Sequence, residues 1–209
     1  KTEREEKELE VYDMIIKERR GERRDDLGEF PKKYSFDNFV VGKNNKFAYS
    51  AAKEITKASN EAFNPLIITS STGLGKTHLL KAIGRKIKRS NPEFEVKFST
   101  TEQCVSDLLS VFRGEGDSEI QDKYFNADVF LLDDVQFLIG REQSQELMFY
   151  LLNSLEQNSS QIVITCDRQP SQLTNYNEKL ISRFRSGLVV NISLPKYNTR
   201  LKIVEQKVS

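Results

Sequence analysis

The chain has 209 residues, of which 37% are hydrophobic and 30% charged, and 32 basic against 31 acidic residues give a net charge of +1. This length can bury one good core, and the balanced charge excludes a bulk attraction to nucleic acid or membranes. Without a membrane-length apolar run or a signal peptide, and with Cys104 and Cys166 lacking metal-ligand spacing, the sequence predicts a reduced, cytoplasmic protein that has no membrane span.

Residues 1–29 are dense in charges of both signs, with a thin apolar stripe of Leu9, Tyr12 and Ile16 at helical spacing. We expect a charged linker or a partner-binding helix here, followed by a folded domain over residues 30–209. The arginines between positions 19 and 24 could contact phosphates, but acidic residues interleave with them, which favours a solvated helix end.

The next stretch places the apolar residues Phe36, Phe39 and Val41 before a turn at Gly42. A helix is expected from about residue 46 to residue 57. The apolar residues are either a hydrophobic latch onto the core or a latch that also flanks a nucleotide base.

A phosphate-binding loop is predicted between residues 65 and 80. The apolar run 66–68 is typical of a buried strand, a loop of small residues follows, and Lys76 and Thr77 open a helix. In such a loop the backbone amides converge on phosphate oxygens, the lysine reaches the β and γ phosphates, and the threonine hydroxyl binds Mg²⁺. The match to G-x-x-x-x-G-K-[ST] is incomplete because Ser70 occupies the first glycine position. For His78, packing or capping is favoured over catalysis.

Beyond this loop, a strand with alternating Phe94, Val96 and Phe98 leads into a helix that we expect Thr101 to cap. This helix carries an apolar face formed by Val105, Leu108, Leu109 and Phe112. A break at 113–118 separates it from a short helix over 119–125.

The apolar strand at 129–134 ends in two acidic residues, Asp133 and Asp134. In a nucleotide site, Asp133 would hold the magnesium shell and Asp134 would orient the attacking water. A buried strand stopped by a turn is the alternative interpretation. Because the glycine loop and the acidic pair occur together, nucleotide binding is favoured.

A helix over 142–157 precedes a strand that ends in Thr165 and Asp167, whose side chains could bond the γ phosphate or the attacking water. Arg183 is either a surface arginine with a carboxylate partner or a residue that reaches a neighbour's site in a ring or helical assembly. A strand over 188–192 follows, and we expect Asn198 or Thr199 to cap a final helix that ends at Val208.

Several ordered segments, among them YSFDNFVVGKNNKFA, STGLGKTHLLKAIG, LLDDVQFL and LISRFRSGL, resemble the AAA+ domain of the bacterial DnaA family of replication initiators. The resemblance covers about residues 31–209. It implies an α/β P-loop NTPase fold, the AAA+ base subdomain, with a parallel five-stranded sheet of order 5-1-4-3-2. It also implies an initiator-type helical insertion over residues 101–125.

The resemblance implies these site residues. The phosphates of ATP or ADP contact Ser71, Thr72, Gly73, Leu74, Gly75, Lys76, Thr77 and His78, and the adenine lies beside Phe39, Val40 and Asn45. Thr77 and Asp133 match the Mg²⁺ ligands. Asp134, the first-sensor residue Asp167 and the finger arginine Arg183 match the catalytic positions.

As partners, the resemblance implies self-association in a head-to-tail open spiral and binding of single-stranded DNA through the helical insertion. The replicative helicase or other replication factors are further expected partners. ATP would act mainly as a switch, with weak, slow hydrolysis ending the active state.

Some positions depart from the family pattern. Ser70 and Ser71 replace glycines, and Lys179 replaces an arginine. Gln143 stands where a DNA-contacting arginine is common, although Arg141 and Lys123 could supply positive charge nearby. The chain stops in the helix expected to lead into a lid, before a second sensor and a helix-turn-helix. A DnaA-related adaptor or helicase loader, or a nucleotide-binding scaffold without hydrolysis, are therefore the alternatives.

Overall fold

The structure is a computed structural model that describes residues 27–57, 63–114 and 118–208. All but residues 27–29 of the expected charged linker or partner helix lie outside the described residues. Within the described residues, no helix combines the length and apolar character needed to cross a bilayer.

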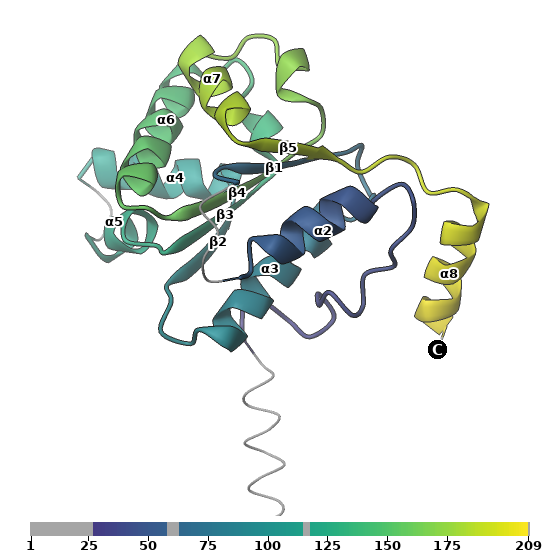
Figure 1. The fold of residues 1–209 in the computed structure, drawn as a ribbon. Coiled ribbons are helices and arrows are strands. Elements are labelled where there is room, and N and C mark those ends of the chain that lie inside the picture. The colour runs from purple at the N-terminus through teal and green to yellow at the C-terminus, as the bar shows by residue number, and fades with distance from the viewer. Residues whose placement is uncertain (1–26, 58–62, 115–117, 209) are drawn as a thin grey trace, which may run out of the picture.

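A parallel sheet of five strands in the order β2-β3-β4-β1-β5 forms the centre of the molecule (Figure 1). The strands are β1 (Leu66–Thr69), β2 (Val96–Thr100), β3 (Val129–Asp133), β4 (Gln161–Cys166) and β5 (Leu188–Asn191). This is the predicted order 5-1-4-3-2 given from the other edge, so the predicted topology is confirmed. β1 and β3 are buried along their whole length, as expected for strands covered on both faces.

Helices cover both faces of the sheet (Figure 1). On one face lie α2 (Lys46–Glu54) and α3 (Lys76–Ser90); on the other lie α4 (Thr101–Phe112), α5 (Ser118–Phe125), α6 (Glu142–Gln157) and α7 (Glu178–Ser186). Successive residues of a strand point to opposite faces of the sheet. Phe130 and Leu132 therefore pack against α4 to α7, and Leu131 packs in the core on the side of α2 and α3. Short 3-10 helices, η1 (Val135–Leu138) and η2 (Pro170–Gln172), follow β3 and β4.

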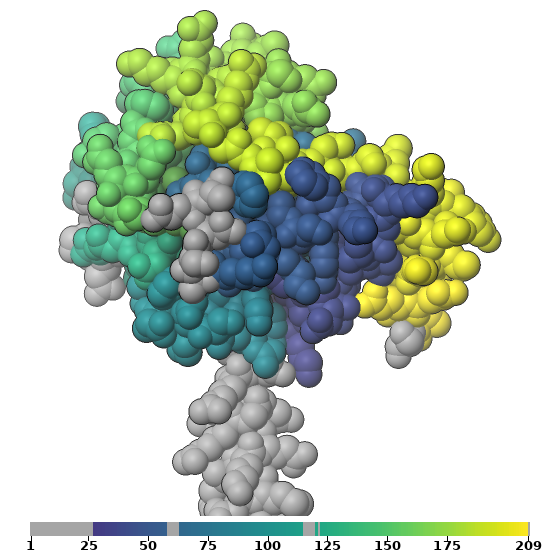
Figure 2. Space-filling view, viewed as in Figure 1, coloured from purple at the N-terminus to yellow at the C-terminus, as the bar shows by residue number. Residues whose placement is uncertain are grey.

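The last helix, α8 (Tyr197–Val208), stands apart from the sheet and lies against the segment before α2 (Figure 2). Gln206 donates a hydrogen bond to the Asp37 carbonyl at 3.4 Å, and residues of both segments, these two included, line a cavity of about 550 Å³. A Cβ on Gly42 would lie 2.4 Å from the hydroxyl oxygen of Thr199, so the glycine permits this close approach.

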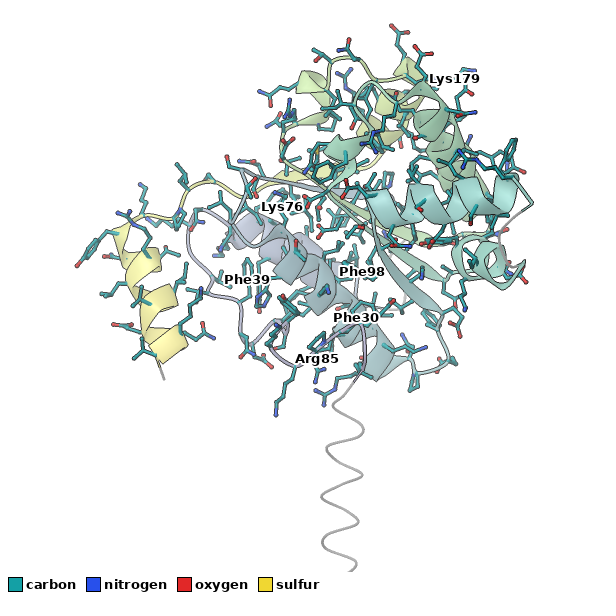
Figure 3. All side chains as sticks on the ribbon, turned by 180° about the vertical axis from the view of Figure 1, so that it is seen from behind. Phe30, Phe39, Lys76, Arg85, Phe98 and Lys179 are labelled. Atoms are coloured by element: carbon teal, nitrogen blue, oxygen red, sulfur yellow. The ribbon has the colours of Figure 1, made fainter. Side chains whose placement is uncertain are left out.

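The predicted hydrophobic latch is present. Phe30, Phe36 and Phe39 are buried against α2 and α3, and buried Arg85 donates a hydrogen bond to the Phe30 carbonyl at 2.9 Å (Figure 3). A fully buried phenylalanine contributes roughly 1.5–3 kcal/mol, so these rings fasten the segment that lines the site described below. Val41, expected to join them, is instead 38% exposed.

Four helix boundaries differ from the sequence predictions, and the smallest difference is at α5, which begins at Ser118 rather than at residue 119. The first helix ends at Glu54 rather than near residue 57. Thr100, which has an extended backbone, caps α4 by accepting a hydrogen bond from the Gln103 amide, so Thr101 was the wrong prediction. α8 begins at Tyr197, which places Asn198 and Thr199 inside the helix rather than at its cap.

Phe112 lies on α4, whose apolar face was expected to include it, but its side chain is 76% exposed.

Candidate functional site

The loop between β1 and α3 has the backbone of a phosphate cradle. Gly73 and Gly75 adopt left-handed conformations with φ of +81° and +98°, which favour glycine over other residues. Ser70 is absent from the left-handed residues of the described chain, and its amide donates to the Cys166 carbonyl at 3.1 Å. Serine at the first glycine position therefore fits the loop without backbone strain.

Lys76 begins α3 and reaches back across the loop. Its ammonium donates to the carbonyls of Ser70 at 2.9 Å and Ser71 at 3.5 Å, and the residue is only 6% exposed (Figure 3). The positive end of the α3 dipole points to the same place. An ammonium and free helix amides at one point form a site for an anion with several oxygens.

The predicted pairing of the loop with the acidic strand end is present. The Thr77 hydroxyl donates to one Asp133 carboxylate oxygen at 2.7 Å, and the Thr165 hydroxyl donates to the other at 2.5 Å. Burial raises the pKa of Asp133, while the hydrogen bonds from Thr165 and Thr77 oppose that rise. In the sheet β4 lies between β1 and β3, so the carboxyl ends of these strands meet where a nucleotide binds in such folds.

Thr77 and Asp133 offer a hydroxyl and a carboxylate, the hard oxygen donors that Mg²⁺ prefers. Their direct hydrogen bond shows that both side chains face one point. The two residues therefore fit the metal role that the sequence predicts.

Asp134 and Asp167 follow the ends of β3 and β4. The Asp134 carboxylate accepts a hydrogen bond from Gln136 at 3.0 Å. The Asp167 carboxylate accepts from Arg168 at 2.7 and 2.8 Å, and this arginine lowers the pKa of Asp167. The buried Thr165 hydroxyl is engaged by the acidic pair, because it donates to Asp133 and accepts from the Asp134 amide at 2.8 Å. The sequence predicts that a polar side chain at this strand end bonds the γ phosphate or the attacking water, and it does not predict these contacts of Thr165 with the acidic pair.

A cavity of about 560 Å³ extends from the loop and is walled by the latch segment on one side and α8 on the other. Its lining includes the expected base-site residues Phe39, Val40 and Asn45, together with Gly73, Leu74, Gly75, His78 and Ile203. Asn45 shapes this wall: its side chain accepts from the Gly42 amide at 2.8 Å and donates to the Val40 carbonyl at 2.9 Å.

His78 connects the loop helix to the latch. Its Nε2 donates to the Ser35 carbonyl at 2.9 Å, and its ring meets Tyr34 and Phe39 edge-on at centroid distances of 5.5 and 5.3 Å. These contacts agree with the predicted packing role. Burial lowers the pKa of His78, and the Ser35 carbonyl only partly opposes this.

The lowered His78 pKa predicts how stability depends on pH. Below about pH 6.5 the unfolded chain binds a proton at this histidine more readily than the folded chain does. As the pH falls, the free energy of unfolding should therefore decrease until the pH passes the folded-state pKa of His78. Urea unfolding between pH 7.5 and 5.5 should show this decrease in the wild type and a smaller one in His78→Gln. The chain has one histidine, so its NMR resonance reports the pKa directly. A midpoint at or above 6.5 would contradict the prediction.

Arg183 is not brought to the chain's own loop. It lies on α7, forms an ion pair with Glu156 of α6 and donates a hydrogen bond to Asn153, and its side chain is 18% exposed. Glu156 is thus the carboxylate partner expected if Arg183 is a surface arginine. The other interpretation, in which Arg183 reaches a neighbour's nucleotide site, needs a second molecule.

The helical insertion of α4 and α5 is fixed to β2 by a buried polar cluster. Tyr124 donates to the Asp107 carboxylate at 2.7 Å, and its hydroxyl lies 3.1 Å from that of Ser99. An apolar groove of about 390 Å³ runs between α4, α5 and α6, with Phe112 and Tyr150 exposed at its rim. Gln143, Arg141 and Lys123 are exposed nearby on these elements or their connections.

The family described as the bacterial DnaA ATPase domain matches residues 30–191 of this chain. The chain belongs to this family. The match confirms the resemblance noted in the sequence.

Individual DnaA proteins agree with this. The chromosomal replication initiator proteins DnaA of Borrelia duttonii and Borrelia recurrentis are each 41% identical over 176 residues, which is 84% of this chain and 36% of the relative. The chain therefore spans about a third of the length of these relatives.

Solved DnaA structures are also similar. Domain III of Thermotoga maritima DnaA has a TM-score of 0.81 and 39% identity, covering 86% of this chain and 75% of that one. AMPPCP-bound DnaA from Aquifex aeolicus has a TM-score of 0.77 and 36% identity, covering 86% and 55%. A DnaA bound to AMPPCP and single-stranded DNA has a TM-score of 0.78 and 35% identity, covering 86% and 55%. The DnaC helicase loader, at 19% identity and a TM-score of 0.65, shares the fold alone.

Proposed function

We propose that this chain is the ATP-binding module of a DnaA-type replication initiator, with residues 30–209 as its AAA+ base subdomain. It binds ATP or ADP with Mg²⁺ and assembles on origin DNA, which it helps to open; slow hydrolysis switches it off. The observation that carries the proposal is the 2.7 Å hydrogen bond between the Thr77 hydroxyl and the Asp133 carboxylate, beside the Lys76 ammonium.

The chain's residues divide the work on the nucleotide. The amides of residues 71–77 and the Lys76 ammonium bind the phosphates, and Thr77 and Asp133 hold Mg²⁺. When bound, Mg²⁺ neutralises phosphate charge and aligns the phosphate oxygens. Asp134 orients the attacking water. Asp167, at the end of β4, is the first-sensor residue and bonds the γ phosphate or this water. The cavity beside Phe39 and His78 takes the base.

Assembly follows from Arg183. On binding ATP, one molecule would present its γ phosphate to Arg183 of the next, in place of Glu156, and so favour a head-to-tail open spiral. The insertion of α4 and α5 would then line a path for single-stranded DNA. The similar DnaA solved with AMPPCP and single-stranded DNA supports this proposal. A replicative helicase or other replication factors are the further proposed partners.

Replacing Arg183 with alanine is expected to leave ATP affinity within about twofold of wild type but to prevent ATP-dependent assembly, since the arginine acts on a neighbour's nucleotide. Sedimentation with Mg²⁺-ATP and single-stranded DNA measures assembly, and calorimetry measures affinity. Arg185→Ala, on the exposed side of the same helix, is the matched control.

Glu156→Gln is informative in the opposite direction, because it removes the internal ion pair of Arg183. Assembly should then need less ATP than in the wild type. Normal assembly of Arg183→Ala would reject the proposed finger.

Hydrolysis separates the initiator from a binding scaffold. The scaffold alternative rested on Ser70, which occupies the first glycine position of the loop. The backbone of Ser70 fits the loop, so this position no longer favours a scaffold. Single-turnover hydrolysis of ATP with single-stranded DNA present should be slow but measurable. An Asp134→Asn variant that binds ATP should hydrolyse it far more slowly, since this removes the carboxylate proposed to orient water.

A further inference from the structure

The residue proposed to orient water has an unusual backbone. Asp134 adopts φ of 59° and ψ of 55°, in the left-handed region that non-glycine residues seldom occupy. Its amide is anchored by the Thr165 hydroxyl at 2.8 Å. Such a conformation persists only where the surrounding structure holds it in place.

Gln136 holds the side chain of Asp134 from the first turn of η1. Its Nε2 donates to the Asp134 Oδ1 at 3.0 Å, and its Oε1 accepts the Asp167 amide at 3.1 Å. These two contacts determine how the amide is turned: the Asp167 N–H needs the oxygen, so the nitrogen faces Asp134. The same side chain therefore links the end of β3 to the end of β4.

The chemistry of the amide suits this position. A neutral donor orients a carboxylate without cancelling its charge, so Asp134 keeps its ability to attract the hydrogen of a water molecule. A lysine or arginine here would hold the carboxylate more tightly and lower its basicity. Within the described residues, Gln136 is the side chain that bonds the Asp134 carboxylate, and Arg168 is occupied by the Asp167 carboxylate.

We propose that Gln136 is a positioning residue for ATP hydrolysis, which fixes the orientation of the Asp134 carboxylate relative to the end of β4. The proposal rests on the proposed role of Asp134. Gln136 lies outside the loop, the Mg²⁺ ligands and the base cavity, so it sets the rate of hydrolysis and leaves nucleotide affinity unchanged.

Two substitutions test this role. Gln136→Glu keeps an acceptor for the Asp167 amide but loses the donor and faces Asp134 with a like charge; Gln136→Met loses both contacts at similar volume. Each should bind ATP within about twofold of wild type, while single-turnover hydrolysis falls roughly 10- to 100-fold, part of the effect of an oriented base. Gln157→Glu and Gln157→Met, at the exposed C-terminal end of α6, are matched controls that should hydrolyse normally.

A thermodynamic cycle distinguishes positioning from a general loss of structure. If Gln136 acts through Asp134, then Gln136→Met should slow hydrolysis in the wild-type background and have no further effect in Asp134→Asn. Thermal melting shows whether Gln136→Glu, which keeps the Asp167 contact, is folded like the wild type. The NMR resonances of the Gln136 side-chain amide should also shift on Asp134→Asn.

The outcomes separate the two proposals. Wild-type hydrolysis by a folded Gln136→Glu or Gln136→Met, with hydrolysis slowed in Asp134→Asn, would overturn the role of Gln136 alone. Wild-type hydrolysis by Asp134→Asn would overturn the proposed function of Asp134, and the role of Gln136 with it. Equal slowing by Gln136→Met in both backgrounds would also overturn positioning.

Discussion

Replacing Lys76 with alanine is expected to abolish measurable ATP binding. The buried ammonium is aimed across the loop at the place where phosphate oxygens would lie, and it donates to the Ser70 carbonyl at 2.9 Å. Removing one partner of a buried, hydrogen-bonded charge pair costs about 2–5 kcal/mol, which corresponds to a loss of affinity of at least roughly 30-fold. Calorimetric titration with Mg²⁺-ATP measures the loss.

Two further variants isolate the ammonium. Lys76→Met keeps much of the side-chain volume and should lose binding as fully as alanine does. Lys86→Ala removes the same charge from an exposed position on α3 and should bind ATP normally. Thermal melting checks that each variant is folded. Equal ATP affinity of wild type and Lys76→Ala would remove the loop from the proposed mechanism.

Of the substitutions proposed for this protein, Gly187→Ala is expected to lower the free energy of unfolding the most. A Cβ at this position would lie 1.9 Å from the carbonyl oxygen and 2.6 Å from the nitrogen of Pro65. Both are backbone atoms, and the same Pro65 carbonyl accepts the Leu188 amide at 3.0 Å where β5 joins β1. Neither strand can move away without losing this pairing. We expect a cost of about 3 kcal/mol or more, at the upper end for overpacking.

Urea unfolding and thermal melting measure this effect, and for a domain of this size the melting temperature should fall by roughly 6–12 °C. Gly140→Ala is the control for glycine chemistry, because Gly140 has φ of +70° with no atom within 4 Å of an added Cβ. It should cost only about 1–2 kcal/mol of backbone strain. If Gly187→Ala melted like the wild type, the close approach of β1 and β5 would be wrong.

Much of the nucleotide site could be predicted from local sequence. A buried strand, a loop with Gly73 and Gly75, and a helix starting at Lys76 form one continuous segment, so short-range preferences define it. The acidic pair likewise follows directly from the end of an apolar strand. Once both strands belong to one parallel sheet, their carboxyl ends share an edge, which explains why the predicted contact of Thr77 with Asp133 is present.

Other features could not be predicted because long-range contacts decide them. The sequence predicts a polar side chain at the end of β4 for the γ phosphate or the attacking water, but it does not predict that the Thr165 hydroxyl bonds Asp133 and the Asp134 amide. Gln136 lies in the segment LLDDVQFL, but nothing local assigns it a role, because its second partner, the Asp167 amide, comes from the end of another strand. Phe112 has the spacing of a core residue yet is exposed, because α5 and α6 do not cover that end of α4.

The amino-acid order alone therefore determined the kind of ligand site and the strands that carry it, since loop conformation and strand ends depend on neighbouring residues. Only the tertiary structure decided which side chains bond the acidic pair, that α8 walls the cavity beside the loop, and that Arg183 pairs within its own chain. Those contacts join residues far apart in sequence, and their geometry arises from how helices pack on the sheet rather than from any local preference.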